Sequence, residues 1–354
     1  MTLHHDPARA VREDSRPAVV TRPWGLLAMQ PKHLAAALYG PRQREELRHL
    51  LRVDHELVVD DFHALPDEVL ERTEVLLSGW SPPPIIAEVL DRMPNLHLVA
   101  HAVGGVQGLE LFEERGITVV SQAEANATPT AEYAVAMILL ANISAFRAQR
   151  LYRQERAYID RERHFLDTGN YESRVGILGA GNVGRTVLAL LRSYDLDLMV
   201  FDPGLTAEQI RGFEARKVDL LELLATSDVI SVHAPDTPRT HHMIGAAELS
   251  LIKDGATLVN SARGRIIDQD ALVAELSTGR IDAVLDVTEP EVLAPDHPLH
   301  ELPNVVLTPH IAGSMGRELH RLADNSIQAL RSHLRDKAGA TPSPAGDLTP
   351  TGSP

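Results

Sequence analysis

The chain has 354 residues, of which 44% are hydrophobic and 23% charged, so it is expected to fold, and its length predicts about two domains. Acidic residues outnumber basic ones by 49 to 34, and the resulting formal charge of −15 argues against a nucleic-acid or anionic-membrane partner. The absence of cysteine excludes disulfides, thiolate metal sites and a cysteine nucleophile, and it fits a reducing compartment.

The two ends of the chain are expected to be disordered tails. Residues 1–19 are mostly polar and charged and lack the apolar run of a secretory signal, and residues 337–354 are rich in Pro, Gly, Ser and Thr. The longest apolar stretch, residues 134–141, is far short of the ~20 residues that a membrane span needs. We therefore expect a cytoplasmic protein without a membrane partner.

The first third of the chain alternates short apolar runs with helix-like stretches, an α/β pattern. Strands are predicted at 56–59, 75–77 and 96–99, and helices at 31–51 and 83–92. A long helix is then predicted over 129–150, with Thr128 as its N-cap.

A more regular alternation of strands and helices begins at Arg174. Strands are predicted at 175–179, 197–201, 229–232, 257–260, 283–287 and 305–307. A helix is predicted over 268–278, with Asp268 as N-cap and Gly279 just past its end. Short apolar strands separated by helices predict a doubly wound parallel sheet, so the fold class is α/β.

The segment Gly179-Ala180-Gly181-Asn182-Val183-Gly184 follows a predicted strand and opens a helix, as a dinucleotide-binding loop does. Gly179 permits the tight turn, Gly181 lets a pyrophosphate approach, and Gly184 allows close packing. The free amides of Asn182 and Val183 would face the phosphates. These features alone leave a site for a methyl donor such as S-adenosylmethionine open.

Asp202 ends the next strand, where a carboxylate would bind the hydroxyls of an adenosine ribose. It would repel a 2′-phosphate, and no Arg or Lys follows it in Pro203-Gly204-Leu205. We therefore predict NAD as the cofactor and consider NADP less favoured.

Four later motifs extend the pattern: SVHAPDTPRT at 231–240, VNSARG at 259–264, LDVTEPE at 285–291 and TPHIAG at 308–313. With the glycine loop and Asp202, they make residues 27–334 resemble the D-isomer-specific 2-hydroxyacid dehydrogenases. The resemblance implies a Rossmann NAD domain, residues 124–303, inserted in a flavodoxin-like substrate domain, residues 20–123 and 304–336. It also implies a homodimer formed through the long helix after Pro129.

The resemblance implies a catalytic set of three residues. Arg263 would bind the substrate carboxylate and polarise the carbonyl, His310 would be the acid and base, and Glu291 would be its partner. Glu289 lies two residues away, but the register of the family motif selects Glu291. The implied activity interconverts a 2-oxo acid and a D-2-hydroxy acid, as in hydroxypyruvate and glyoxylate reductases.

The resemblance also places residues around the cofactor and the substrate. Asp286 would hold the nicotinamide carboxamide. Other residues implied at the cofactor are Thr130, Pro203, His233, Ala234, Pro235, Thr240, Ser261, Ala262 and Gly313. The backbone of Val103, Gly104 and Gly105 would hold the substrate carboxylate. Trp80 either lines the substrate pocket or packs beneath this loop.

Other features bear on alternatives. His241-His242 and the pair His297 and His300 lack helical spacing with a nearby acid, so no metal site is expected. Glu291 disfavours formate as substrate, since the formate branch of the family carries Gln there. The lack of Lys and Arg in 77–82 argues against 3-phosphoglycerate, as does the short chain after the second domain. An NAD(H)-sensing binding protein or corepressor on the same fold remains the alternative function.

Overall fold

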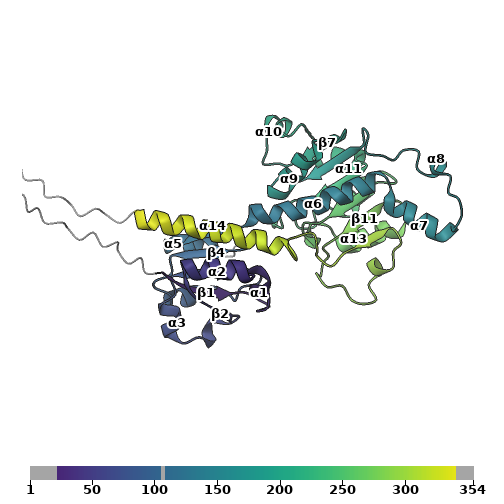
Figure 1. Cartoon of the computed structure of the whole chain (residues 1–354). Helices are drawn as coiled ribbons and strands as arrows, with labels where there is room; N and C mark the ends of the chain where they lie inside the picture. Colours follow the sequence, from purple (N-terminus) through teal and green to yellow (C-terminus); the bar gives the residue numbers. More distant parts are fainter. Residues whose placement is uncertain (1–21, 105–107, 340–354) are drawn as a thin grey trace, which may run out of the picture.

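The computed structural model describes residues 22–104 and 108–339, and its strands form two wholly parallel sheets. The smaller sheet has the order β2-β1-β3-β4-β5 and the larger the order β12-β11-β10-β9-β6-β7-β8. The two sheets confirm the predicted α/β class. Figure 1 shows them in two units side by side, with the smaller unit beneath α14.

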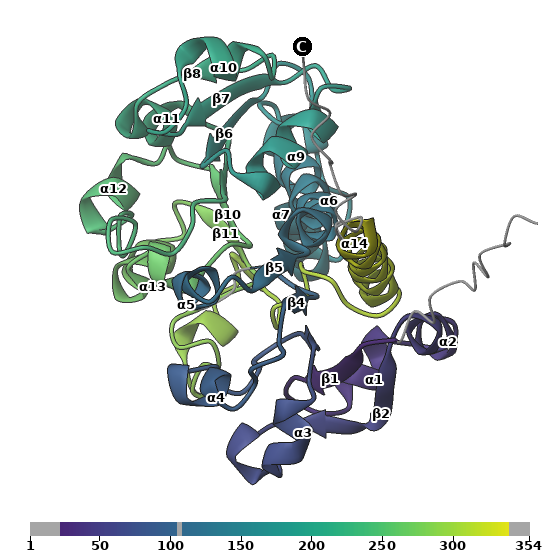
Figure 2. The ribbon, with the colours of Figure 1, turned by 90° about the vertical axis from the view of Figure 1, so that its left-hand side faces the viewer.

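The strands of the smaller sheet are β1 (Trp24–Ala28), β2 (Arg52–Val59), β3 (Val75–Ser78), β4 (Leu98–His101) and β5 (Thr118–Ser121). Its helices are α1 (Leu34–Leu38), α2 (Pro41–Leu50), the 3-10 turn η1 (Phe62–Ala64), α3 (Asp67–Glu71), α4 (Ala87–Asp91) and α5 (Leu109–Glu114). The last helix of the chain, α14 (Glu318–Gly339), returns to this unit and packs Leu322 and Leu330 into its core. Figure 2 shows α14 beside α6 and above α2.

The strands of the larger sheet are β6 (Arg174–Leu178), β7 (Asp197–Phe201), β8 (Arg216–Lys217), β9 (Val229–Val232), β10 (Thr257–Asn260), β11 (Asp282–Leu285) and β12 (Val305–Leu307). One face packs against α6 (Ala123–Asn142), α9 (Asn182–Leu191) and α10 (Ala207–Arg211). The other face packs against α11 (Leu220–Thr226), α12 (Ala246–Leu251) and α13 (Gln269–Ser277). The remaining elements are α7 (Ala145–Glu155), α8 (Arg161–His164) and the 3-10 turns η2 (Gly264–Ile266) and η3 (Pro298–His300).

Burial on both faces explains why several strands match their predicted bounds. Every residue of β9 and β10 is buried, so neither strand shows the alternation of apolar and polar residues that marks a strand with one exposed face. The strands at 197–201, 229–232, 257–260 and 305–307 are confirmed at those residues. The helix predicted over 268–278 is confirmed as α13, whose N-cap Asp268 accepts a hydrogen bond from Ala271 N at 3.1 Å.

Two long helix predictions were wrong. The helix predicted over 31–51 is two helices, because the chain is extended at Gly40 and Pro41 begins α2. The helix predicted from Pro129 begins six residues earlier, so Thr128 is not an N-cap and Pro129 lies inside α6. The same helix ends at Asn142, where Ser144, with φ of 50°, turns the chain into α7.

Smaller shifts concern the ends of elements. The strand predicted at 96–99 is β4 at 98–101, and the helix predicted at 83–92 shortens to α4. α14 continues to Gly339 and so enters the segment 337–354 that was expected to be a disordered tail. The rest of that tail and residues 1–19 lie outside the described residues.

The chain passes between the sheets twice, and we propose these passages as the domain boundaries. The first lies between β5 and α6, near the boundary expected at 123 and 124. The second lies between β12 and α14, which is later than the expected boundary at 303, because β12 pairs with β11 in the larger sheet.

No single helix in residues 22–104 and 108–339 meets the length and hydropathy expected of a membrane span; α6 and α7 meet it only as a pair bent by 53°.

Candidate active site

The glycine loop joins β6 to α9, and its three glycines have different surroundings. Gly179 has φ of +95°, and a Cβ there would lie 2.7 Å from Ala234 N. A Cβ at Gly184 would lie 2.1 Å from Gly179 O, so only glycine allows the helix to pack this closely. A Cβ at Gly181 would meet no atom within 4 Å, so this glycine borders open space. The loop thus leaves room for a ligand at its middle glycine.

The start of α9 and the end of β7 complete this cradle. α9 begins with no side-chain cap, which leaves the first amides, those of Asn182 and Val183, without a capping oxygen. Asp202 Oδ2 accepts a hydrogen bond from Ala180 N at 2.8 Å, and Asp202 Oδ1 accepts one from Gly204 N at 2.8 Å. An uncapped helix end beside an open glycine and a strand-end carboxylate fits a dinucleotide.

His233 and Ser261 each bury a polar atom, His233 Nδ1 and Ser261 Oγ, that finds no hydrogen-bond partner in the part of the chain that the structure describes. The other ring nitrogen of His233 lies 2.9 Å from Ser231 Oγ. Burial lowers the pKa of His233 to about 4, so the ring is neutral at pH 7. An unpaired buried atom costs free energy unless a ligand satisfies it, which supports a binding role for both residues.

Pro235 and Thr240 belong to one turn after β9. Thr240 Oγ1 donates to Pro235 O at 2.5 Å and accepts from Thr237 N at 2.9 Å. Thr240 therefore braces the loop that carries His233 and Ala234. Thr130 is buried in α6, where its hydroxyl donates to Asn126 O at 3.2 Å. A Cβ at Gly313 would meet no atom within 4 Å.

The structure brings His310 and Glu291 into direct contact. His310 Nδ1 faces Glu291 Oε1, and the two side chains are 45% and 56% exposed. They lie on the loops after β12 and β11, neighbouring parallel strands whose carboxyl ends share one edge of the sheet. A pocket of about 340 Å³ opens beside them, and His300, Leu293 and Leu307 also line it.

Asp286 holds the turn that carries His310. Its buried carboxylate accepts hydrogen bonds from Thr308 Oγ1 at 2.6 Å and from the amides of Ile311 and Ala312, both at 2.8 Å. Its backbone oxygen accepts His310 N at 2.9 Å. These bonds fix His310 in a left-handed conformation, with φ of 54°. The contact expected between Asp286 and a nicotinamide carboxamide would have to use the lone pairs of the carboxylate that these bonds leave free.

Tyr133 and Thr308 belong to this network, although nothing in the sequence pattern singled them out. Tyr133 extends from α6, and its hydroxyl lies 2.9 Å from Thr308 Oγ1. Burial raises the pKa of Tyr133, which keeps the hydroxyl protonated. The two residues are 175 positions apart in sequence, so spacing gives no signal of their contact.

Arg263 lies on the loop after β10, which Asn260 braces. Asn260 Nδ2 donates to Arg263 O at 3.0 Å, and Asn260 Oδ1 accepts Ala262 N at 3.0 Å. Gly264 packs this loop onto the segment before Glu291, because a Cβ there would lie 2.2 Å from Thr288 O. Within residues 22–104 and 108–339, Arg263 forms no hydrogen bond or ion pair with His310 or Glu291, and its exposed guanidinium donates a hydrogen bond only to Ala262 O.

The predicted substrate side is less complete. Trp80 and Val103 are half-buried and pack against the core of the smaller sheet, and Gly104 lies near Ala123, at the start of α6. Gly105 lies outside the described residues. The ends of β3 and β4 also bring together two buried residues that the sequence reasoning missed, with Ser78 Oγ 2.8 Å from His101 Nδ1.

His241 and His242 have no acid at helical spacing in the sequence, but the fold brings one beside them. His242 Nε2 lies 2.9 Å from Glu289 Oε2, and Glu289 Oε1 lies 3.3 Å from Arg265 Nε. The contact joins residues 47 positions apart, so helical spacing could not reveal it. Glu289 is thus engaged away from His310, while Glu291 is the acid that contacts this histidine.

Comparison with known proteins agrees with this geometry. The family described as "D-isomer specific 2-hydroxyacid dehydrogenase, NAD binding domain" matches residues 135–312. The glyoxylate reductase of Korarchaeum cryptofilum is 34% identical over 256 residues, which cover 71% of this chain and 77% of that protein. The D-3-phosphoglycerate dehydrogenase of Archaeoglobus fulgidus is 36% identical over 231 residues, which cover 64% of this chain and only 43% of that protein.

A solved structure extends the similarity to most of the chain. The D-lactate dehydrogenase of Aquifex aeolicus, complexed with NAD and lactic acid, superposes with a TM-score of 0.68 at 27% identity. The match covers 85% of this chain and 93% of that one, so it includes both sheets. These similarities confirm the resemblance seen in the sequence motifs, and the chain belongs to the D-isomer-specific 2-hydroxyacid dehydrogenase family.

Proposed function

We propose that this protein catalyses the NAD(H)-dependent interconversion of a 2-oxo acid and a D-2-hydroxy acid. The observation that carries the proposal is the contact between His310 Nδ1 and Glu291 Oε1, on the sheet edge that also bears the glycine loop. A carboxylate on one ring nitrogen orients the imidazole and leaves the other nitrogen free for proton transfer.

In the direction of reduction, the chain's own residues would bind the acid and supply a proton. The guanidinium of Arg263 would bind the substrate carboxylate through two N–H groups and polarise the C2 carbonyl. Bound NADH would supply the hydride that reaches C2. His310 Nε2 would donate the proton to the carbonyl oxygen, and Glu291 would stabilise the positive charge that the ring carries before this transfer.

For the cofactor, we propose NAD over NADP. The amides at the start of α9 would face the pyrophosphate, and Asp202 would accept hydrogen bonds from the adenosine ribose. Both Asp202 oxygens already accept backbone amides, so the carboxylate is held in position at the end of β7. Equal catalytic efficiency with NADH and NADPH would contradict this assignment.

For the substrate, we propose a small 2-oxo acid without a phosphate group. The loop after β3, residues 79–82, contains no Lys or Arg, and Trp80 contributes apolar surface there. The similarity to a D-3-phosphoglycerate dehydrogenase makes the phosphorylated acid the competing substrate. A panel of glyoxylate, hydroxypyruvate, pyruvate, branched 2-oxo acids and 3-phosphohydroxypyruvate separates these cases.

The test is NADH oxidation across this panel by the wild type, His310→Ala, Glu291→Gln and a control, His49→Ala. His49 is an exposed histidine that lies 3.4 Å from Glu45 on α2, so it reproduces a surface His–Glu pair away from the site. We expect turnover by the wild type and the control, loss in His310→Ala, and a large reduction in Glu291→Gln. Tight NADH binding without turnover on any acid would instead support an NAD(H)-sensing protein.

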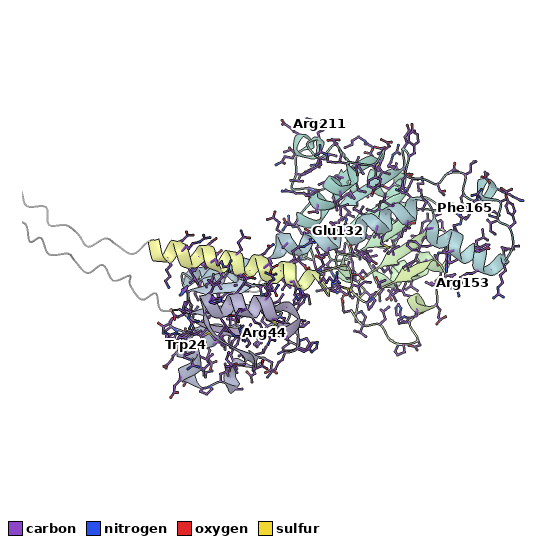
Figure 3. All side chains as sticks on the ribbon, viewed as in Figure 1. Trp24, Arg44, Glu132, Arg153, Phe165 and Arg211 are labelled. Carbon is purple, nitrogen blue, oxygen red and sulfur yellow. The ribbon has the colours of Figure 1, made fainter. Side chains whose placement is uncertain are left out.

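We also propose a homodimer that uses the segment from the end of α6 to α8. Large apolar side chains are exposed along it, with Ile143 at 45%, Tyr152 at 63% and Tyr158 at 82%. Figure 3 shows Arg153 on this segment and Phe165 directly after it, at the far end of the molecule from α14. Exposed apolar clusters of this kind mark protein contacts. Light scattering on the wild type should give a dimer mass, and Tyr158→Asp should shift it toward the monomer.

A further inference from the structure

We propose that His241, His242 and Glu289 bind one transition-metal ion of the Zn²⁺ class. One ligand atom from each residue lies within 4.8 Å of the other two. Two imidazoles and one carboxylate are a donor set that Zn²⁺ and neighbouring transition metals accept, whereas Ca²⁺ and Mg²⁺ require mostly oxygen ligands. The site joins the loop after β9 to the loop after β11 and is separate from the glycine loop.

The ligand atoms need only small movements to surround an ion. In a tetrahedral site with bond lengths of 2.0–2.1 Å, neighbouring ligand atoms lie about 3.3 Å apart. His242 Nε2 and Glu289 Oε2 are 2.9 Å apart, so they would separate slightly as the metal replaces their shared proton. The His241 ring stacks on His242 with centroids 3.9 Å apart, and its exposed side chain is free to turn toward the ion.

The backbones that carry the ligands are held in place. His242 N donates to Arg265 O at 2.8 Å, and His242 adopts a left-handed conformation with φ of 50°. Glu289 N donates to Gln269 Oε1 at 2.8 Å, while Gln269 Nε2 donates to Glu289 O at 2.5 Å. Fixed backbones reduce the ordering cost of binding.

Arg265 limits the affinity but leaves a ligand atom available. Its guanidinium lies 3.3 Å from Glu289 Oε1, so the other carboxylate oxygen, Oε2, remains for the ion. The positive charge of Arg265 repels a cation, which predicts reversible rather than permanent binding. A bound ion would tie the His241–His242 turn to the segment that leads through Pro290 to Glu291, and the folded chain would be stabilised by mass action.

The experiment measures Zn²⁺ binding by calorimetry on the full chain after removal of metal with EDTA. The parent carries His4→Ala and His5→Ala, because this adjacent pair, outside the described residues, can itself bind zinc. We expect one Zn²⁺ per chain in the parent, and binding weaker by roughly tenfold or more in His241→Ala, His242→Ala and Glu289→Gln. His49→Ala, the matched exposed histidine beside Glu45, should bind as the parent does.

Co²⁺ provides a second readout that does not depend on enzymatic activity. The parent should show the visible absorption of a low-symmetry Co²⁺ site, and His242→Ala should lose it, while circular dichroism shows that both are folded. Absence of saturable Zn²⁺ binding by the parent would overturn the proposal. So would an unchanged affinity in the double variant of His241→Ala and His242→Ala. Because binding itself is measured, neither result bears on the proposed dehydrogenase activity.

Discussion

Replacement of Thr308 by Val tests whether the network beneath His310 positions this residue. Thr308 Oγ1 donates to the buried carboxylate of Asp286 at 2.6 Å, and valine has a similar shape without the hydroxyl. A hydrogen bond to a charged group contributes about 1.5–3 kcal/mol. We expect Thr308→Val to lower the free energy of unfolding by about 2 kcal/mol, because Asp286 Oδ1 keeps only the amide of Ile311.

The same substitution should reduce catalysis, because His310 N donates to backbone oxygens of both Asp286 and Thr308. If most of the lost energy had oriented His310, kcat/KM would fall by about 10- to 100-fold, the equivalent of roughly 1.4–2.8 kcal/mol. Urea unfolding measures the first effect, and NADH oxidation with the best acid of the panel measures the second. A positioning role also predicts a change in the pH profile of kcat.

Two further variants make this reasoning refutable. Thr308→Ser keeps the hydroxyl and should restore most of the lost kcat/KM. Tyr133→Phe removes only the outer bond of the network, at 2.9 Å, and should lower the free energy of unfolding by about 1 kcal/mol. The hydroxyl does not position His310 if Thr308→Val keeps the stability and the kcat/KM of the wild type. The same conclusion follows if Thr308→Ser fails to restore kcat/KM.

Three other predictions concern the cofactor loop, acid stability and an internal ion pair. Gly181→Ala should keep the wild-type melting temperature but weaken NADH binding at least roughly tenfold in a fluorescence titration. Gly184→Ala should instead lower the melting temperature, because the Cβ of residue 184 would lie 2.1 Å from Gly179 O. The pKa of His233 is about 4 in the folded state and 6.5 in the unfolded state, so the unfolded state takes up the proton first as the pH falls. The free energy of unfolding should therefore decrease between pH 6.5 and pH 4, by about 3 kcal/mol in urea unfolding, and His233→Gln should remove this decrease. Arg150→Ala should cost about 1–2 kcal/mol in the same assay at pH 7, because its partner Asp282, at 2.6 Å, is only 22% exposed.

The fold was predictable where short-range pattern and burial agree. β7 and β9 are apolar runs between polar loops, and α13 has a capping aspartate and a glycine just past its end. Prediction failed at prolines, because a proline can either begin a helix or lie inside one. Pro41 begins a helix, whereas Pro129 lies inside one whose buried face continues on both sides of it. Tertiary packing decides between these outcomes, and a local sequence window does not contain it.

In the candidate site, too, contacts between residues near in sequence were predictable, and contacts between distant residues were not. The glycine loop and Asp202 are near in sequence, so their spacing predicts the loop that the structure shows. The contact of Thr308 with Tyr133 joins the loop after β12 to α6, and that of His242 with Glu289 joins the loops after β9 and β11. The order of β9, β10, β11 and β12 in the sheet brings these loops together, and no motif encodes this order on its own.

The charge of −15 raises the question of how an acidic chain would bind an anionic cofactor and an anionic acid. The answer lies in the local pairing of the site's carboxylates. Asp202 and Asp286 accept backbone amides, Glu289 faces Arg265, and Glu291 faces His310. Arg263 is different, since it has no carboxylate partner in residues 22–104 and 108–339. Because screening weakens the field of surface charges beyond about 10 Å, anion binding depends on these local groups rather than on the net charge.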